Sequence, residues 1–451
     1  MKIAIIGSGI TGLGSAWLLN QQHEIVVYEQ ADRVGGHSNT VDAPVGLDGS
    51  DVPVDTGFIV FNDQTYPNLV ALFDQLGVGA TDTSMSFSVS TRNGALEYSG
   101  TSVRHLYAQA SNLFRLRHHR MVADILSFYR RAPSLLTEFD DDRESPSLEA
   151  YLSANGYGDG FIYDHLLPMG AAIWSTTVAE MMRFPATSFI RFFHNHGLLQ
   201  VHNRPQWRTV SGGSRSYVDR MTAPFADRIR IGAGAVKVTR MGPCVAVRDT
   251  GGAVDVFDQV VLACHADQAL ALLGDPTADE HAVLSRFRYE PNRAILHTDP
   301  SLMPRRRRVW SSWNYLSHRH SVDDARVSVS YWMNRLQNLK NAKDVFVTLN
   351  PLREPDPASV IAAFDYDHPQ FDHSAVLAQR RLGDLQGINR TWFCGSYCGY
   401  GFHEDALSAG LAVAEALGAR RPWQVDEVSP AGRNVTPDLP VVPDALKIAA
   451  E

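Results

Sequence analysis

Short apolar runs separated by glycine and polar residues are the clearest pattern at the start of the chain. Residues 2–6 form an apolar run after Lys2, which predicts a short buried strand. A helical pattern follows and continues through Trp17, Leu18 and Leu19. Residues 24–28 are again strand-like and lead directly to Glu29. The chain therefore opens with a predicted strand, helix and second strand.

Three glycines occupy the turn between the first strand and the helix. Gly7 allows a tight turn, Gly9 lets the backbone approach a pyrophosphate, and Gly12 lets the helix pack closely on the strand. Phosphates would then meet free N–H groups at the helix N-terminus, and Glu29 could accept both ribose hydroxyls. Because these features occur in order, with about twenty residues from glycines to acid, the sequence predicts a dinucleotide site rather than a turn without a ligand.

Basic and apolar residues recur at roughly helical spacing over residues 103–137. This pattern predicts an amphipathic segment with a basic face that either is solvated or contacts an anionic membrane. Four consecutive arginines at 305–308 form a second basic run. The first segment contains the apolar residues Leu106, Leu113, Leu116, Met121, Ile125, Leu126, Phe128 and Tyr129 and the basic residues Arg115, Arg117, His118, His119, Arg120, Arg130 and Arg131.

Aromatic and polar residues are closely mixed over residues 160–215, for example at Trp174, Phe192, His196 and Trp207. Such a mixture suits a lined cavity, although ordinary packing is the alternative for each aromatic ring. Further along the chain, residues 285–370 alternate strand-like runs with turns, which predicts an antiparallel sheet.

Composition narrows the class of protein. The 451 residues are too many for one hydrophobic core, so we expect two interleaved domains. A net charge of −8 (41 basic against 49 acidic residues) gives no reason to expect nucleic acid as a partner. No run approaches twenty apolar residues and no signal peptide is evident, so we expect a cytoplasmic protein. The cysteines are too few and scattered for a disulfide framework or a metal site: Cys244, Cys264, Cys394 and Cys398.

The residues after Glu29 give the first family resemblance. Arg33 and a glycine pair ending at Gly36 follow the acid after a short spacer, an order that resembles the flavin amine oxidase and phytoene desaturase superfamily. This resemblance implies FAD as the resident cofactor, with the glycine pair along its phosphates. Residues 54–58 resemble the segment that passes the flavin. Many members have arginine after the glycine pair, whereas this chain has His37, a weaker and pH-dependent partner.

The same resemblance continues near the C-terminus. Residues 391–396 read as a strand that runs into Gly395, and residues 401–410 open a helix that in this superfamily points its N-terminus at the flavin. Free N–H groups and the helix dipole would stabilise negative charge there. Phe402 replaces a tyrosine of the amine oxidases. The resemblance implies FAD contacts at Gly7, Gly9, Gly12, Glu29, Arg33, Gly36, His37, Thr56, Gly57, Phe58, Val236, Gly395, His403, Glu404 and Asp405, with Phe402 and His403 as catalytic candidates.

A narrower resemblance suggests the substrate. Residues 55–62, 85–87, 195–199, 331–334 and 401–405 look like a bacterial family of NAD/FAD-binding proteins often encoded beside cyclopropane-fatty-acid synthase-like methyltransferases. It implies an FAD-dependent oxidoreductase that removes hydride from a CH–CH unit of a lipid acyl chain, on a lipid or other apolar substrate. The alternatives are a flavin amine oxidase acting on a CH–NH group and a non-catalytic lipid-binding relative. The sequence leaves the oligomeric state open.

Together these features predict an α/β fold, with a Rossmann-type FAD-binding domain, an interleaved α+β substrate domain built on an antiparallel sheet, and a helical insertion. We expect the FAD-binding domain over residues 1–100, 205–285 and 385–420. The substrate domain, with the basic amphipathic segment, should cover residues 101–204 and 286–384, and residues 421–451 should form a C-terminal tail.

Overall fold

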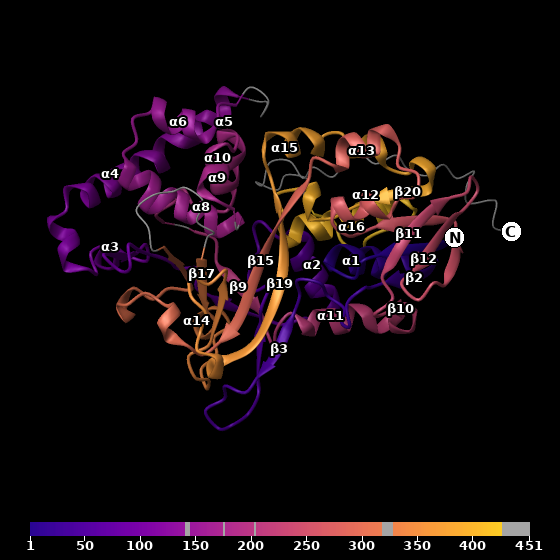
Figure 1. Ribbon diagram of the computed structural model, residues 1–451, viewed down its shortest axis with the longest axis horizontal. Helices are drawn as coiled ribbons and strands as arrows, with labels where there is room; N and C mark the ends of the chain where they lie inside the picture. Colours follow the sequence, from indigo (N-terminus) through magenta and orange to yellow (C-terminus); the bar gives the residue numbers. More distant parts are fainter. Residues whose placement is uncertain (140–144, 175, 203, 318–327, 426–451) are drawn as a thin grey trace.

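The computed structural model describes residues 1–139, 145–174, 176–202, 204–317 and 328–425 (Figure 1). Its helices and strands build a mixed α/β fold, as the sequence predicts. A parallel sheet with its helices lies at one end, and a group of helices stands at the other (Figure 1). A mixed sheet lies below the helical group in Figure 1, and its long strands β15 (Arg288–His297) and β19 (Val360–Gln370) run beside the parallel-sheet part.

The parallel sheet has five strands in the order β10-β2-β1-β14-β20. β1 and β2 and the helix between them confirm the strand–helix–strand unit expected at the start of the chain. The helix α16, which begins at His403, confirms the helix that the sequence predicts to open over residues 401–410. The elements are β1 (Lys2–Ile6), α1 (Ile10–Leu19), β2 (Glu24–Tyr28), β10 (Ile229–Arg230), β14 (Gln259–Leu262), β20 (Thr391–Phe393) and α16 (His403–Ala416).

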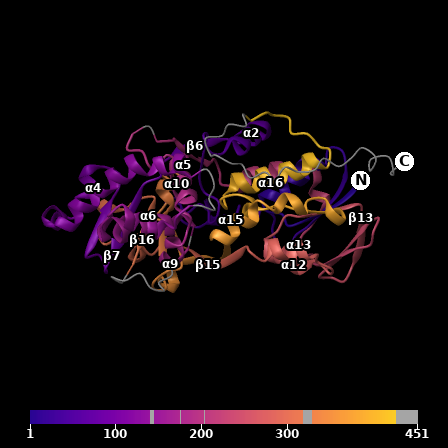
Figure 2. The same cartoon turned by 90° about the horizontal axis from the view of Figure 1, so that it is seen from above.

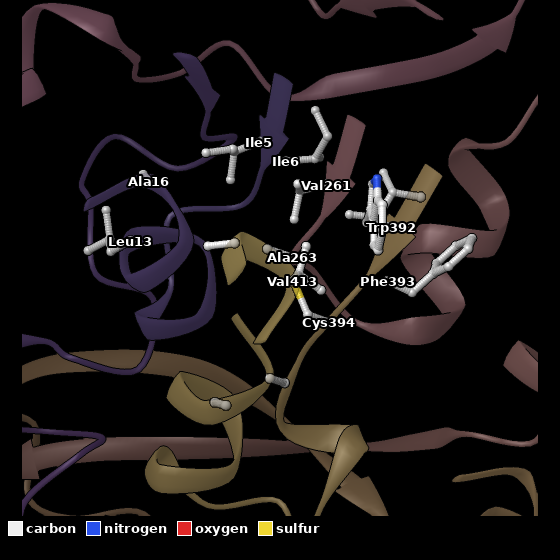
Figure 3. Close-up of a cluster of buried hydrophobic side chains, with 14 of the residues drawn as sticks. Ile5, Ile6, Leu13, Ala16, Val261, Ala263, Trp392, Phe393, Cys394 and Val413 are labelled. Carbon is white, nitrogen blue, oxygen red and sulfur yellow. The ribbon is translucent and has the colours of Figure 1, made fainter. Parts of the chain in front are cut away.

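Side chains from β1, β14, β20, α1 and α16 converge in one core (Figure 3). Ile5, Leu13, Val261, Trp392 and Val413 are each at most 1% exposed. Burying a side chain of this kind contributes about 1.5–3 kcal/mol relative to leaving it in water. The first strand and helix are therefore held in the same apolar cluster as α16.

The helices α1 and α16 pack at very short range. A Cβ atom on Gly410 would lie 2.3 Å from the carbonyl oxygen of Thr11, so only glycine fits there. The Ser15 hydroxyl donates to the carbonyl oxygen of Gly410 at 2.9 Å. This contact fixes the helix that begins at His403 against the helix that follows the glycine turn.

The mixed sheet has seven strands in the order β19-β15-β18-β17-β16-β7-β8, with antiparallel neighbours except for β16 and β7. β7 and β8 pair here although the predicted boundary at residue 100 groups them with the FAD-binding part. A short strand does not reveal its partner in its own sequence. The strands are β7 (Phe87–Thr91), β8 (Leu96–Ser99), β15 (Arg288–His297), β16 (Trp313–Leu316), β17 (Ser328–Trp332), β18 (Phe346–Leu349) and β19 (Val360–Gln370).

Smaller elements surround these two sheets. Three small sheets pair β3 with β4, β5 with β9 and β6, and β11 with β12 and β13. Their strands are β3 (Thr40–Ala43), β4 (Val52–Asp55), β5 (Phe61–Asn62), β6 (Ala80–Thr83), β9 (Trp207–Val210), β11 (Ala235–Arg240), β12 (Val245–Asp249) and β13 (Val254–Phe257). The helices near them are α2 (Pro67–Leu76), α11 (Arg215–Thr222), α12 (Ala266–Leu272), α13 (Ala278–Leu284), α14 (Met333–Leu336) and α15 (His373–Gln379).

The basic amphipathic segment forms several helices rather than one. Its longest helix, α4, turns His118, Met121, Ile125 and Phe128 into the core of the helical group. None of the described helices is long and apolar enough to cross a membrane. The helical group contains α3 (Val103–Leu106), the 3-10 helix η1 (Ala110–Phe114), α4 (Leu116–Arg131), α5 (Leu135–Glu138), α6 (Leu148–Ala154), α7 (Asp159–Phe161), α8 (Leu167–Trp174), α9 (Val178–Met182) and α10 (Ala186–Asn195).

Candidate flavin site

The glycine turn between β1 and α1 has the geometry that a dinucleotide needs. Gly7 has a φ of 104°, and its Cβ would lie 2.7 Å from the carbonyl oxygen of Ala263. A Cβ on Gly12 would lie 1.9 Å from the carbonyl oxygen of Gly7. By contrast, a Cβ built on Gly9 would meet no atom of the described residues within 4 Å beyond its own chain neighbours. Gly9 therefore presents an open backbone surface, as the approach of a pyrophosphate requires.

Glu29 is fixed at the end of β2, facing this turn. Its carboxylate accepts hydrogen bonds from the Ser8 N–H at 3.0 Å, the Ser8 hydroxyl at 2.6 Å and the Ala31 N–H at 2.8 Å. A carboxylate offers about four lone-pair positions, so roughly one is left. Glu29 could thus accept one ribose hydroxyl at once, and a second if the Ser8 hydroxyl turns away.

The second glycine pair lies directly against the first turn. A Cβ on Gly36 would lie 3.1 Å from the Cα of Gly9. On either side of the pair, Arg33 Nη1 and His37 Nε2 are buried without a hydrogen-bond partner among the described residues. A buried polar group without a hydrogen-bond partner costs about 1–3 kcal/mol. A ligand that accepts from Arg33 Nη1 and forms a hydrogen bond with His37 Nε2 would remove this cost. The phosphates of FAD fit these residues.

His37 is held as a neutral ring. Burial, reinforced by the neighbouring His368, holds the pKa of His37 well below its ordinary value. Its ring stacks on Tyr366 with centroids 4.8 Å apart. His37 therefore meets a phosphate as a hydrogen-bonding partner and not as the permanent cation that an arginine would supply.

The segment of Thr56, Gly57 and Phe58 runs beside the glycine pair. The Phe58 N–H donates to the carbonyl oxygen of His37 at 2.8 Å, and a Cβ on Gly57 would lie 2.2 Å from that oxygen. The Phe58 ring stacks on His403 at a centroid distance of 3.8 Å. These contacts bring the three predicted segments, at the Gly-Gly pair, at residues 56–58 and at the start of α16, into one place.

His403 begins α16 and is bound on its inner side. Its Nε2 lies 2.7 Å from the Tyr217 hydroxyl and 3.3 Å from the Ser38 hydroxyl. Burial lowers the pKa of His403 to about 3, so the ring is uncharged at neutral pH. Ser38 and Tyr217 are site residues that sequence reasoning missed, because they come from separate segments and match no motif. With Nε2 bonded in this way, His403 positions the start of the helix, and its catalytic role stays a prediction.

Glu404 and Asp405 are buried and bonded to the protein itself. The carboxylate of Glu404 accepts the N–H groups of Asn68 at 2.9 Å and Leu69 at 3.0 Å, at the beginning of α2. Asp405 accepts the N–H of Phe402 at 2.9 Å. Burial raises the pKa of each carboxyl to about 7. Their side chains thus serve the fold, and any contact with FAD is left to the backbone at this end of α16.

The remaining two predicted contacts lie at the rim of this region. Gly395 follows β20, and a Cβ there would lie 3.4 Å from the carbonyl oxygen of Cys264, just after β14. Val236 lies on β11 and is 48% exposed, as an apolar contact for an adenine would be before binding. Both residues stay predictions as FAD contacts.

Phe402 packs against the helical group. Its ring stacks on Phe192 of α10 with centroids 4.9 Å apart, and the His196 ring lies 5.8 Å away. Burial lowers the pKa of His196 to about 4, and its Nδ1 is bonded to the carbonyl oxygen of Phe192. Phe402, Phe192 and His196 form an uncharged and largely buried aromatic cluster, in which Phe192 is 2% and His196 8% exposed; we call it the aromatic wall. The Trp174 ring packs against Phe192 with centroids 4.6 Å apart, and it is buried as an ordinary core side chain.

Comparison with known proteins agrees with this geometry. The family model for flavin containing amine oxidoreductases matches residues 10–418. A proposed flavin-containing monoamine oxidase of Mycobacterium tuberculosis, AofH, is 23% identical over 390 residues, which cover 84% of this chain and 77% of that protein.

Solved structures share the fold over nearly the whole chain. Putrescine oxidase bound to putrescine matches with a TM-score of 0.63 and 16% identity, over 93% of this chain and 100% of that one. A CLA-producing fatty acid isomerase from P. acnes matches with a TM-score of 0.66 and 14% identity, over 92% and 98%. Because the family model spans most of the chain and the glycine turns fit the cofactor, this protein belongs to the flavin containing amine oxidoreductase family and is an FAD-dependent oxidoreductase.

Proposed function

We propose that the enzyme removes hydride from a CH–CH unit of a lipid acyl chain. The observation that carries the proposal is the aromatic wall of Phe402, Phe192 and His196, which is uncharged at neutral pH. An apolar chain can pack against such a wall without a free-energy cost of desolvation. A protonated amine would have to give up water there, which costs free energy unless a partner replaces it.

The carboxyls closest in sequence to this wall do not supply that partner. Glu404 is bonded to the start of α2, and Asp405 is bonded to the backbone of Phe402. Phe402 also lacks the phenol that the amine oxidases carry at this position. These features favour an apolar substrate.

In this proposal the cofactor and the protein have separate roles. When bound, FAD supplies the acceptor for both hydrogens that the CH–CH unit loses, one as hydride and one as a proton, which leaves a C=C bond. Gly9, Gly36, Arg33 and His37 hold its phosphates, and Glu29 holds its ribose. The aromatic wall excludes water from the reacting carbon atoms.

A flavin amine oxidase is the second candidate, since AofH and putrescine oxidase are named for that activity. Aromatic rings can also attract an ammonium group through their π faces. The shared fold does not choose, because it also serves a fatty acid isomerase. A non-catalytic lipid-binding relative would have no use for the open surface at Gly9 and the unsatisfied Arg33 and His37 atoms.

Anaerobic reduction of the bound flavin distinguishes the candidates. We expect phospholipids with saturated, monounsaturated or methyl-branched chains to bleach the visible flavin band, whereas putrescine and cyclohexylamine should leave it intact. Bleaching by the amines alone would establish the second candidate, and bleaching by neither, in protein that still binds phospholipid, would establish the third. The variant Phe402→Tyr is the matched control, because it adds only a phenol to the ring. We expect phospholipids still to bleach the flavin band of this variant and the two amines still to leave it intact.

A further inference from the structure

The most exposed large apolar side chains of the described structure gather at one end of the molecule. Phe114 is 88% exposed, Leu116 86% and Val103 71%, and Leu113 beside them is 51% exposed. They belong to α3, η1 and the first turn of α4, which lie at the opposite end from β12 and β13 (Figures 1 and 2). Clustered exposed apolar groups of this kind mark a surface that meets another apolar phase.

This cluster is not the apolar face of the predicted amphipathic helix. That face holds His118, Met121, Ile125 and Phe128, all buried in the helical group. The apolar face of α4 is therefore part of the protein core and does not form the exposed cluster. The exposed apolar side chains lie on α3, on η1 and on the first residue of α4.

Positive charge surrounds the exposed cluster. Residues 92–123 contain five arginines and one acidic residue, Glu97, in a chain of net charge −8. Glu97 is buried and already paired with Arg306 at 2.7 Å. Arg104 and Arg115 have no carboxylate partner among the described residues, whereas Arg117 pairs with Asp164 at 2.8 Å.

The second basic run joins the first on the hairpin between β7 and β8. Arg115 donates to the carbonyl oxygen of Ala95 at 2.9 Å, and Arg306 donates to that of Gly94 at 3.1 Å. Arg305 is exposed and lies against Gly94 as well. Two basic segments that are far apart in the sequence thus flank one projecting end.

We propose that this end docks the protein reversibly on an anionic lipid bilayer. The docking tip consists of Val103, Arg104, Leu113, Phe114, Arg115, Leu116 and Arg305. Its apolar side chains enter the headgroup boundary while its arginines meet lipid phosphates, and apolar burial and charge act together in such binding. An excess of arginine on an otherwise acidic protein favours a polyanionic surface over an apolar protein partner. The inference does not depend on which substrate is oxidised.

Vesicle co-sedimentation of the FAD-loaded protein tests this. We expect binding to vesicles of phosphatidylcholine with phosphatidylglycerol at low salt, little binding to phosphatidylcholine alone, and loss of binding at high salt. The double variant Phe114→Ser/Leu116→Ser and the double variant Arg104→Glu/Arg115→Glu should each weaken the partition coefficient by about tenfold or more.

The opposite end of the molecule supplies matched controls. Val254 and Val256 on β13 are 53% and 48% exposed, and Arg248 lies beside them on β12. Val254→Ser/Val256→Ser and Arg248→Glu should bind vesicles like the parent protein. All variants should keep the parent's visible flavin spectrum and melting temperature, which shows that they fold.

Three results would overturn the proposal. The first is equal sedimentation of the parent protein with and without anionic vesicles. The second is a loss of vesicle binding in the control variants as large as the loss in the docking-tip variants. The third is a parent protein that binds no vesicles but forms a dimer in solution, which Phe114→Ser/Leu116→Ser converts to a monomer. The last result would assign the tip to a second copy of the chain. None of them would alter the assignment as an FAD-dependent oxidoreductase.

Discussion

Glu29 shows how much one carboxylate does at this site. It accepts hydrogen bonds from Ser8 and Ala31, and we predict that it also accepts one from the ribose of FAD. We predict that Glu29→Ala weakens FAD binding by about 1–3 kcal/mol through the loss of charge-assisted hydrogen bonds. Titration of stripped protein with FAD, followed by flavin fluorescence, measures this. Glu24→Ala is the control, because Glu24 is exposed at the other end of β2. Unchanged FAD affinity in Glu29→Ala would show that the ribose lies elsewhere.

The buried Glu404 makes stability depend on pH. Burial raises the pKa of this carboxyl from 4.5 to about 7, so the folded state holds the proton more tightly than the unfolded state. Its contribution to stability is therefore full below pH 4.5 and is lost as pH rises toward 7, by at most about 3 kcal/mol.

Urea unfolding of the parent protein and Glu404→Gln across this range measures the effect. We predict that the free energy of unfolding of the parent, relative to Glu404→Gln, decreases as pH rises, since glutamine does not titrate. An increase would mean that the N–H groups of Asn68 and Leu69 stabilise the carboxylate more than burial destabilises it.

The cysteines illustrate residues whose environment excludes a chemical role. Burial raises the pKa of the Cys264 and Cys398 thiols to about 12 and that of Cys394 well above its ordinary value. A thiolate is the reactive form, so these thiols are inert at neutral pH. We predict that replacing these three and Cys244 by alanine leaves turnover within about threefold of the parent when the protein retains its flavin. Loss of turnover in a folded, yellow protein would reveal a nucleophile.

At the scale of elements, the contact between α1 and α16 couples the two anchors of the cofactor site. Gly410 has no room for a side chain beside Thr11, and Gly12 has none beside Gly7. We predict that Gly410→Val lowers the free energy of unfolding by about 1–3 kcal/mol, since overpacking forces the helices apart, and also weakens FAD binding. Thermal melting and FAD titration measure both effects. Ala412→Val is the control, because Ala412 lies on the partly exposed side of α16. Gly418→Val would not serve, because the φ of 98° at Gly418 adds strain to any side chain there.

The elements that could be predicted from the sequence are those whose own residues carry a recognisable motif. The strand–glycine–helix unit at the N-terminus and the helix after Gly401 each carry their own signal, and both are present. The sequence could not predict which sheet β7 and β8 join, because a short strand does not specify its partners. It also could not predict what the apolar face of α4 packs against, because an amphipathic helix does not specify the surface that it meets. The same limit applies to the site: Gly7, Gly9 and Gly36 follow from a motif, but Ser38, Tyr217 and Tyr366 join it only in three dimensions.

At the scale of the whole molecule, the cofactor site and the docking tip lie in different parts. The glycine turns belong to the parallel sheet, and the tip belongs to the helical group at the other end (Figure 1). The aromatic wall stands between them, since Phe402 comes from the start of α16 and Phe192 from α10. We predict that anionic vesicles change the rate of flavin reduction by a lipid but not the affinity for FAD. A rapid-mixing experiment and an FAD titration, each with and without vesicles, separate the two quantities; a change in FAD affinity alone would contradict the arrangement.

The strand order of the parallel sheet has a consequence for how the chain is made. β1 lies between β2, which follows it at once, and β14, which begins at Gln259, while β20 at Thr391 closes the sheet. During translation the N-terminal strand therefore leaves the ribosome with one edge unpaired and waits for most of the chain to be synthesised. An unpaired apolar edge invites association with other chains. Growing cells should accordingly need chaperones most while this protein is half-made, and the two predicted flavin segments are both present only after α16 has emerged.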